Sequence, residues 1–431
     1  MRGFHLISWE LVIISHPDNA KRESIRPMAR INITTTERHA IISVALIMSL
    51  RMIGLFMVLP LFSLYAAKLS GATPTLMGIA MGIYGLLQAL CQIPLGMASD
   101  RFGRKPIIAM GLTIFAIGSL IAGFSHSITQ TIIGRALQGA GAVGGTTLAL
   151  LSDLTRETIR TLSMAIAGIT IGVSFALAML IGPVLMQWYS FPDLFFIAGV
   201  LGLVCIFILY AYTPTPAQEI PPIQAINNEK RSFFKLLLYP QLAMLNGGIF
   251  TLHAIFTASF VVIPLSLLKF AKLEITHQWS IYLPTLSIAF IIALACISLA
   301  ERKAQIKRYF LGSIVLLLVS EIIFWLAPKN IFFISIGLGL FFACFSLLEA
   351  MLPSLVSRLA PPTHRGSALG LYSCSQFLGI FVGGVFGGWL LGRYSFTGVY
   401  LFCIVCSLAW LIFSFPIQPP VAKQQTESST I

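Results

Sequence analysis

Apolar stretches long enough to cross a lipid bilayer as helices follow one another along almost the whole sequence. A membrane-spanning helix needs about 20 consecutive residues that are mainly apolar. Twelve stretches meet this requirement, at 39–66, 73–99, 105–124, 129–151, 161–187, 193–212, 241–268, 279–300, 308–327, 330–355, 366–391 and 397–416. Only 10% of the residues are charged and 57% are hydrophobic, whereas soluble domains are roughly 25% charged. The sequence therefore predicts an all-α membrane protein with twelve transmembrane helices.

One long connection divides these spans into two sets of six. It is rich in Pro and then in charged residues, which is typical of a linker. The sequence predicts five segments: a cytoplasmic N-terminal extension at 1–38, a six-helix bundle at 39–212, a cytoplasmic linker at 213–240, a second six-helix bundle at 241–416 and a cytoplasmic tail at 417–431. The N-terminal extension lacks the cleavage pattern of a signal peptide, and Met28 is an alternative start.

Basic residues set the expected orientation in the membrane. With the N-terminus inside the cell, 21 Lys and Arg fall in cytoplasmic segments, 5 fall outside, and Arg51 and Arg135 lie within spans. An excess of Lys and Arg in cytoplasmic loops is the usual rule for membrane proteins. We therefore expect both termini in the cytoplasm, in the inner membrane of a Gram-negative bacterium. The net charge of +13 follows from this topology and does not indicate nucleic-acid binding.

Residue patterns that would support enzymatic chemistry do not occur in the sequence. We find no nucleophile–base pair, metal-ligand spacing or nucleotide-binding loop, and the loops are too short for a catalytic domain. All seven Cys lie within apolar spans, so packing explains Cys403 and Cys406 better than metal binding or redox chemistry does. We expect no enzyme activity, no metal and no cofactor. A membrane-embedded enzyme or receptor is the remote alternative.

The two sets of spans share features at matching positions. Asp100-Arg101 follows the second span, and Glu301-Arg302 follows the eighth span at the same point of the other set. Arg160 stands just before the fifth span, as Arg365 stands before the eleventh. Parallel repeats of this kind are typical of transporters whose two halves rock against each other.

The loop after the second span is the most specific motif in the sequence. Its pattern is Gly-x-x-x-Asp-Arg-x-Gly-Arg-Lys, filled by Gly96, Asp100, Arg101, Gly103, Arg104 and Lys105. With the twelve spans in two sets, this loop resembles that of the major facilitator superfamily, from about residue 39 to 416. The chain is similar in particular to the drug:proton antiporter group and to its YajR-type bacterial transporters. Those relatives carry a C-terminal cytoplasmic domain, and this sequence ends at Ile431, soon after the last span.

Each residue type in this loop has a physical reason. Gly96 lets another helix approach closely, and Gly103 permits the positive φ of a tight reversal. Asp100 lies at the negative end of a helix, so it needs a positive partner. The resemblance implies that it docks on the start of the eleventh span, near Gly366, when the cytoplasmic side is closed. It also implies that Arg104 pairs with Asp153. Charges that only fix the topology are the alternative.

Two further motifs bear on coupling and direction of transport. Arg135 in the fourth span fits a family motif in which this Arg assists proton movement; an Arg that holds backbone carbonyls of the first or fifth span is the alternative. Gly182-Pro183 in the fifth span partly fits the motif of antiporters, because Met186 and Gln187 replace two expected Gly. We expect this Gly-Pro pair to bend a helix that packs closely on the eighth span.

A proton-coupled transporter needs a titratable group that each side reaches in turn. Glu321 and Glu349 are the acids well inside spans, and the resemblance places the tenth span, with Glu349, on the central cavity. We predict Glu349 as the proton site, or as an ion-pair partner of Arg51 or Arg135. Glu321 is expected either to snorkel or to pair locally. His253 in the seventh span is either a proton carrier or a packing residue.

Further polar residues are candidates for lining the cavity: Gln88, Gln92, Gln138, Asn246 and Gln376. The Gly residues of the eleventh span repeat at helical spacing and indicate a packing surface. We expect a monomeric multidrug efflux antiporter that exchanges a small amphipathic or hydrophobic substrate for protons across the bilayer. A proton-coupled importer, or a facilitator of sugars or metabolites, is the alternative.

Overall fold

The structure is a computed structural model, and it describes residues 33–215, 239–302, 305–361 and 365–417. The helices are α1 (Thr35–Phe56), α2 (Leu59–Ala66), α3 (Pro74–Phe102), α4 (Arg104–Gly123), α5 (Ile128–Ala140), α6 (Gly144–Asp153), α7 (Glu157–Leu185), α8 (Phe191–Ala211), α10 (Pro240–Lys269), α11 (Trp279–Arg302), α12 (Ile306–Leu326), α13 (Ile331–Leu359) and α14 (Arg365–Ser414). A single 3-10 turn, Ile275–His277, precedes α11.

Ten helical segments of the described residues are long and apolar enough to cross a membrane, and one of them is α1 with α2. Helix α14 reverses direction at Ser395, where φ is 60° and ψ is −160°, so it supplies two crossings. Helices α5 and α6 together supply one more. The described ranges therefore hold twelve crossings, and the predicted all-α membrane fold is confirmed.

Helix starts are set by local side-chain chemistry. Thr34 and Glu37 form a reciprocal capping box at the start of α1, and Ser127 and Gln130 do the same for α5. Such boxes satisfy backbone N–H groups that have no partner within the helix. Gly103 has a φ of 91° between α3 and α4, which is the positive φ predicted from the sequence.

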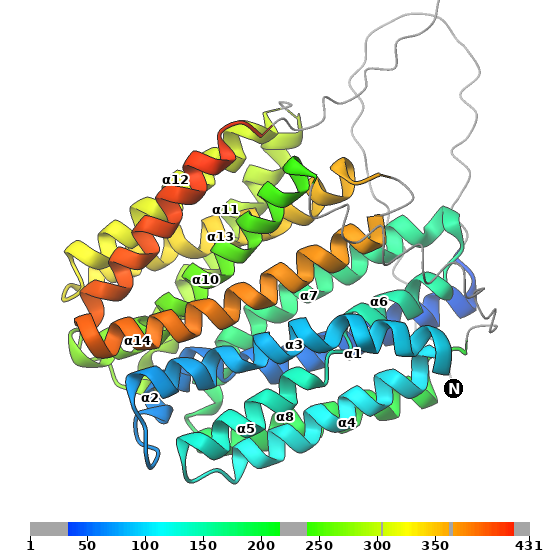
Figure 1. Ribbon diagram of the computed structural model, residues 1–431, viewed down its shortest axis with the longest axis horizontal. Helices are drawn as coiled ribbons and strands as arrows, with labels where there is room; N and C mark the ends of the chain where they lie inside the picture. The colour runs from blue at the N-terminus through cyan, green and yellow to red at the C-terminus, as the bar shows by residue number, and fades with distance from the viewer. Residues whose placement is uncertain (1–32, 216–238, 303–304, 362–364, 418–431) are drawn as a thin grey trace, which may run out of the picture.

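The crossings form two groups, α1 to α8 and α10 to α14, which we call the N-half and the C-half (Figure 1). Helix α3 runs beside the part of α14 before Ser395 and also contacts α10. In addition, α2 contacts α10 and α7 contacts α11. These contacts join the halves. We call the end of the bundle with Thr35, Asp100 and Pro240 the linker end, and the end with Ala66 and Lys269 the opposite end.

The halves pack tightly near the opposite end because Gly residues face one another there. A Cβ atom on Gly78 of α3 would lie 2.8 Å from the Cα of Gly388 and would also meet the carbonyl oxygen of Gly384, both on α14. Within the C-half, Gly379, Gly383 and Gly387 of α14 lie equally close to the backbone of α10. The predicted packing surface of the eleventh span is confirmed.

Toward the linker end the halves separate. Among the described residues, no atom lies within 4 Å of a Cβ built on Gly96 of α3 or on Gly366 and Gly370 of α14. Gly168 and Gly172 of α7 have the same open surroundings. Among the described residues, α3 and the part of α14 before Ser395 are therefore in close contact toward the opposite end and apart toward the linker end.

Three local expectations need correction. The predicted fourth span is not one helix, because Gly141 ends α5 where it packs on the carbonyl oxygen of Gly111. The predicted loop between the last two spans is instead the reversal within α14. Gly96 has no other helix close to it in the described structure, although a close approach was expected there. Helix α7, which carries Gly182, does contact α11, as expected for the fifth and eighth spans, and a Cβ on Gly182 would meet the carbonyl oxygen of Met57, at the break between α1 and α2. Pro183 lies within α7 beside it.

Candidate functional site

Glu349 on α13, the predicted proton site, contacts two other predicted residues. Gln376 on α14 donates a hydrogen bond from Nε2 to Glu349 Oε1 over 2.9 Å. The same amide nitrogen lies 2.9 Å from Nε2 of His253 on α10, and His253 Nε2 is 3.8 Å from Glu349 Oε2. We call Glu349, His253 and Gln376 the Glu349 cluster.

The contacts of His253 define its protonation pattern. Its Nδ1 lies 3.3 Å from the carbonyl oxygen of Ile249, which can only accept, so Nδ1 carries the hydrogen. Nε2 then accepts the second hydrogen of the Gln376 amide, and the imidazole is neutral. Among the described residues, no donor bonds to Glu349 Oε2. This oxygen is the position at which Glu349 can take up a proton.

The arginines do not pair with Glu349, so the alternative of an ion pair with Arg51 or Arg135 is wrong for this structure. Arg51 donates to Gln88 Oε1 over 2.8 Å, and Arg135 donates to Gln138 Oε1 over 2.8 Å. Gln88 and Gln138 therefore orient guanidinium groups, although we expected them to face a substrate.

Arg135 also contacts two aromatic rings. Its guanidinium carbon lies 5.2 Å from the ring centre of Tyr84 and 5.8 Å from that of Phe62. A cation over an aromatic face is stabilised by the ring quadrupole. The bonds of Arg135 thus go to Gln138 and to rings, and the alternative of an Arg that holds backbone carbonyls is wrong.

An aromatic layer borders the Glu349 cluster and joins the two halves. Phe175 of α7 lies 5.0 Å from Phe56 of α1, 5.6 Å from Phe256 of α10 and 5.5 Å from Phe345 of α13, between ring centres. The ring of His253 lies 5.5 Å from that of Phe345. We call Phe56, Phe175, Phe256 and Phe345 the aromatic plug.

The direction of each helix places this plug on the side of the opposite end. Helix α10 runs from the linker end, so Phe256 lies beyond His253; α13 runs the other way, so Phe345 also lies beyond the Glu349 cluster. The side chain of Glu349 is 35% exposed, against 5% for His253. The side chain of Glu349 is therefore partly exposed, although its Oε2 atom is buried, and aromatic rings lie beyond the Glu349 cluster toward the opposite end. The sequence signal for this plug is the spacing of Phe256 and Phe345 from His253 and Glu349, three and four residues along each helix.

At the linker end the predicted loop residues form a local network. Arg104 forms an ion pair with Asp100 one turn before it and donates from Nε to Asp153 Oδ2 over 2.9 Å, which is the pairing expected for Asp153. Lys105 donates from Nζ to the carbonyl oxygen of Thr213 over 2.6 Å. Arg101 is exposed and lies over the Phe102 ring.

Asp100 does not contact the start of α14 in this structure. Its partner is Arg104, and the described surroundings of Gly366 are open. Partly exposed ion pairs are worth roughly 0–1 kcal/mol, so Asp100 can exchange Arg104 for another partner at little cost. The contact with α14 is expected only when the cytoplasmic side is closed, and it stays a prediction.

The remaining predicted polar residues are not gathered at one place. Gln92 lies near Gly145, 3.7 Å from where its Cβ would be, and Asn246 is buried on α10. Glu321 is fully buried and accepts a hydrogen bond from Ser259 over 2.9 Å, so its expected local pairing is confirmed. Among the described residues, no three His, Cys, Asp or Glu side chains form a group that could hold a metal ion.

Comparison with known proteins yields a family and relatives along most of the chain. The family model of the Major Facilitator Superfamily matches residues 44–353 and 306–430. The inner membrane transport protein YajR of Escherichia coli strain K12 is 41% identical over 391 residues, which cover 90% of this chain and 85% of YajR. The multidrug resistance protein MdtL of Klebsiella pneumoniae strain 342 is 26% identical over 382 residues, which cover 84% of this chain and 91% of MdtL.

A solved structure shows the same fold. The crystal structure of a bacterial homolog to the human lysosomal transporter Spinster, in an inward-facing and unoccupied conformation, superimposes with a TM-score of 0.71 at 14% identity. The superposition covers 89% of this chain and 98% of that chain.

Proposed function

Because the chain belongs to the Major Facilitator Superfamily of membrane transporters, we propose that it exports small molecules in exchange for protons. Members of this family move solutes and are not enzymes. The proposed cycle is alternating access: the two halves rock, so that a central site opens first to one side of the membrane and then to the other. The proton gradient drives the cycle, and no cofactor takes part.

One observation carries the proton coupling. Glu349 is a partly exposed carboxylate at membrane depth, held by Gln376 and His253, and the aromatic plug lies beyond this cluster toward the opposite end. Ionisable groups inside a membrane are costly and typically mark ion or proton pathways. In the proposed cycle Glu349 releases its proton at the side shown here and takes one up when the opposite end is open. His253 and Gln376 hold the carboxylate in place, and Arg51 and Arg135 keep the surrounding field positive.

The sidedness follows from charge. The linker end carries most of the Lys and Arg residues, and such ends face the cytoplasm in most membrane proteins. We therefore infer that both termini are cytoplasmic and that the structure is the inward-open state. The similarity to YajR, an inner membrane transport protein of Escherichia coli, supports the inner membrane of a Gram-negative bacterium as the location.

The direction of transport is inferred from two features. Gly182-Pro183 matches part of the antiporter motif, and MdtL is named as a multidrug resistance protein. A substrate and a proton that compete for Glu349 cannot bind together, which makes their movements opposite. We infer an amphipathic or hydrophobic substrate, because apolar and aromatic side chains dominate the surroundings of the Glu349 cluster.

Proteoliposomes loaded with ethidium, with the protein inserted in one known orientation, test this function. An imposed proton gradient, with the acidic side at the opposite end, is expected to drive ethidium from the linker-end side to the acidic side. A protonophore is expected to stop this movement. Proton-driven movement of ethidium in the other direction would show an importer. Ethidium movement at the same rate with and without the protonophore would show a facilitator.

The loop at the linker end yields the first mutational prediction. Asp100→Asn is expected to reduce the fraction of molecules whose linker end is closed about tenfold, which corresponds to a contact of roughly 1.4 kcal/mol between Asp100 and the start of α14. Reaction of cysteines placed near Gly366 with a membrane-impermeant reagent measures that fraction. Arg101→Gln is the control, because this exposed neighbour has no part in the contact. Equal labelling of wild type and Asp100→Asn would contradict the proposed contact.

The aromatic plug yields the second mutational prediction. Phe175→Ala is expected to let protons leak through the protein without substrate, because removal of this ring opens the hydrophobic seal beside the Glu349 cluster. A pH-sensitive dye inside proteoliposomes, with a potassium diffusion potential as the driving force, reports the leak. Phe207→Ala, at a side chain that is 63% exposed, is the control. If the proton leak through Phe175→Ala were as slow as that through this control, the aromatic plug would not be the seal.

A further inference from the structure

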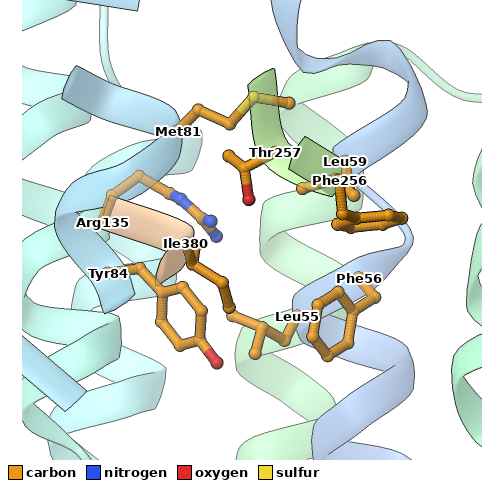
Figure 2. Close-up of a pocket in the computed structure, with 9 residues that line it drawn as sticks. All are labelled: Leu55, Phe56, Leu59, Met81, Tyr84, Arg135, Phe256, Thr257 and Ile380. Carbon is orange, nitrogen blue, oxygen red and sulfur yellow. The ribbon is translucent and has the colours of Figure 1, made fainter. Parts of the chain in front are cut away.

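A small cavity lies between the two halves, beside the aromatic plug (Figure 2). The N-half and the C-half both line it, with Leu55, Phe56, Leu59, Met81, Tyr84, Arg135, Phe256, Thr257 and Ile380. Its volume is about 10 Å³, which is close to the space that one water molecule needs. A small space lined by polar residues from both halves is a candidate binding site.

Polar atoms without partners line this cavity. Among the described residues, none forms a hydrogen bond with Arg135 Nε, Thr257 Oγ1 or the Tyr84 hydroxyl. All three side chains are at least 98% buried. Buried polar groups in folded proteins nearly always have a partner, and a charged donor without one is especially unfavourable.

The arrangement of these groups points to one ligand between two of them. Figure 2 shows the guanidinium of Arg135 and the hydroxyl of Thr257 directed into the same space from opposite walls, while the Tyr84 hydroxyl points away from it. Arg135 belongs to α5 in the N-half and Thr257 to α10 in the C-half. A ligand that bonds to both would connect the halves.

We propose that this cavity binds one water molecule, which accepts a hydrogen bond from Arg135 Nε–H and donates one to Thr257 Oγ1. The size of the cavity favours water over an inorganic anion, and the rings of Tyr84 and Phe62 already stabilise the charge of Arg135. The water satisfies the buried guanidinium while the opposite end is closed.

The water site has a consequence for the transport cycle, and this part rests on the proposed alternating access. Because the cavity walls belong to different halves, opening of the opposite end separates Arg135 from Thr257 and breaks the bridge. Thr257 is then a positioning residue for the closed opposite end. Its role differs from that of the Glu349 cluster, which carries the proton.

Radiolytic footprinting of the purified protein tests the site without substrate or proton gradient. X-rays produce hydroxyl radicals from bound water, and Met81 lines the cavity although it is only 1% exposed. We expect Met81 to be oxidised several-fold faster than Met179, which is 0% exposed and does not line the cavity. Thr257→Val should remove most of this difference, because valine keeps the shape and loses the hydroxyl. Thr257→Ser should keep it.

The outcomes separate the alternatives. Equal oxidation of Met81 and Met179 in the wild type overturns the proposal, as does a Thr257→Val protein in which Met81 is oxidised as fast as before. Replacement of chloride by gluconate should leave Met81 oxidation unchanged; a change would show that an anion occupies the cavity.

Distances between spin labels at the opposite end should show a several-fold larger fraction of molecules with this end open in Thr257→Val than in Thr257→Ser. A failure of proton-coupled export would leave the footprinting result as it stands.

Discussion

Glu349→Gln is expected to abolish proton-driven export while the protein stays folded and still exchanges substrate between the two sides. Glutamine has the same shape as protonated glutamate and can keep the contact with Gln376, which is 2.9 Å long in the wild type. It cannot release a proton, so the proton gradient no longer biases the cycle. Ethidium transport in proteoliposomes, measured once with a proton gradient and once with only an ethidium gradient, separates the two activities.

Glu321→Gln is the matched control for this prediction. It makes the same chemical change at the other intramembrane carboxyl, which is fully buried beside Ser259 in the described C-half. Because Glu321 lies away from the Glu349 cluster, we expect proton-driven export to continue. If Glu349→Gln kept full proton-driven export, the proposed coupling role of the Glu349 cluster would be contradicted. If proton-driven export stopped in both variants, the assignment of coupling to Glu349 alone would be wrong.

The second large effect is expected at the contact between α3 and α14. Gly384→Val should prevent the opposite end from closing, because the Cβ atom alone would lie 2.9 Å from the backbone nitrogen and Cα of Gly82. Forced overpacking typically costs about 1–3 kcal/mol, and each 1.4 kcal/mol shifts a two-state equilibrium about tenfold. Transport should fall by about fivefold to a hundredfold, since the state with a closed opposite end becomes rare. Ethidium efflux measures the loss.

Gly312→Val controls for a general effect of valine at a glycine. Gly312 is exposed on α12, and among the described residues no atom lies within 4 Å of a Cβ there. We expect near-normal transport from this variant. Near-normal transport from Gly384→Val would mean that the tight contact is not needed for the cycle.

Much of the fold could be predicted from local sequence because hydropathy and helix-end chemistry are local properties. The apolar runs predicted the crossings, and the loop pattern predicted the positive φ of Gly103. These features depend on residues within one helix or one loop, whereas the pairing of Arg104 with Asp153 joins two helices and was expected only from the family resemblance. The fold class therefore followed without knowledge of how the helices pack.

Features that depend on packing could not be predicted. The break after α5 arises because Gly141 meets the backbone of Gly111, which lies in another helix. Glu349 bonds to Gln376 and not to Arg51 because α13 and α14 bring those two side chains together. A Phe at helical spacing fits a lipid-facing surface as well as a plug, so the role of Phe175 became visible only through its contacts across the halves.

Spin-label distances at both ends of one molecule test the rocking of the halves most directly. Labels replace Arg160 and Arg365 at the linker end, or Lys68 and Lys272 at the opposite end; all four side chains are exposed, and each pair joins the two halves. In a cysteine-free background, Asp100→Asn should lengthen distances at the linker end and shorten those at the opposite end. Gly384→Val should do the reverse. Distances that change at one end alone, or lengthen at both ends together, would contradict alternating access in this protein.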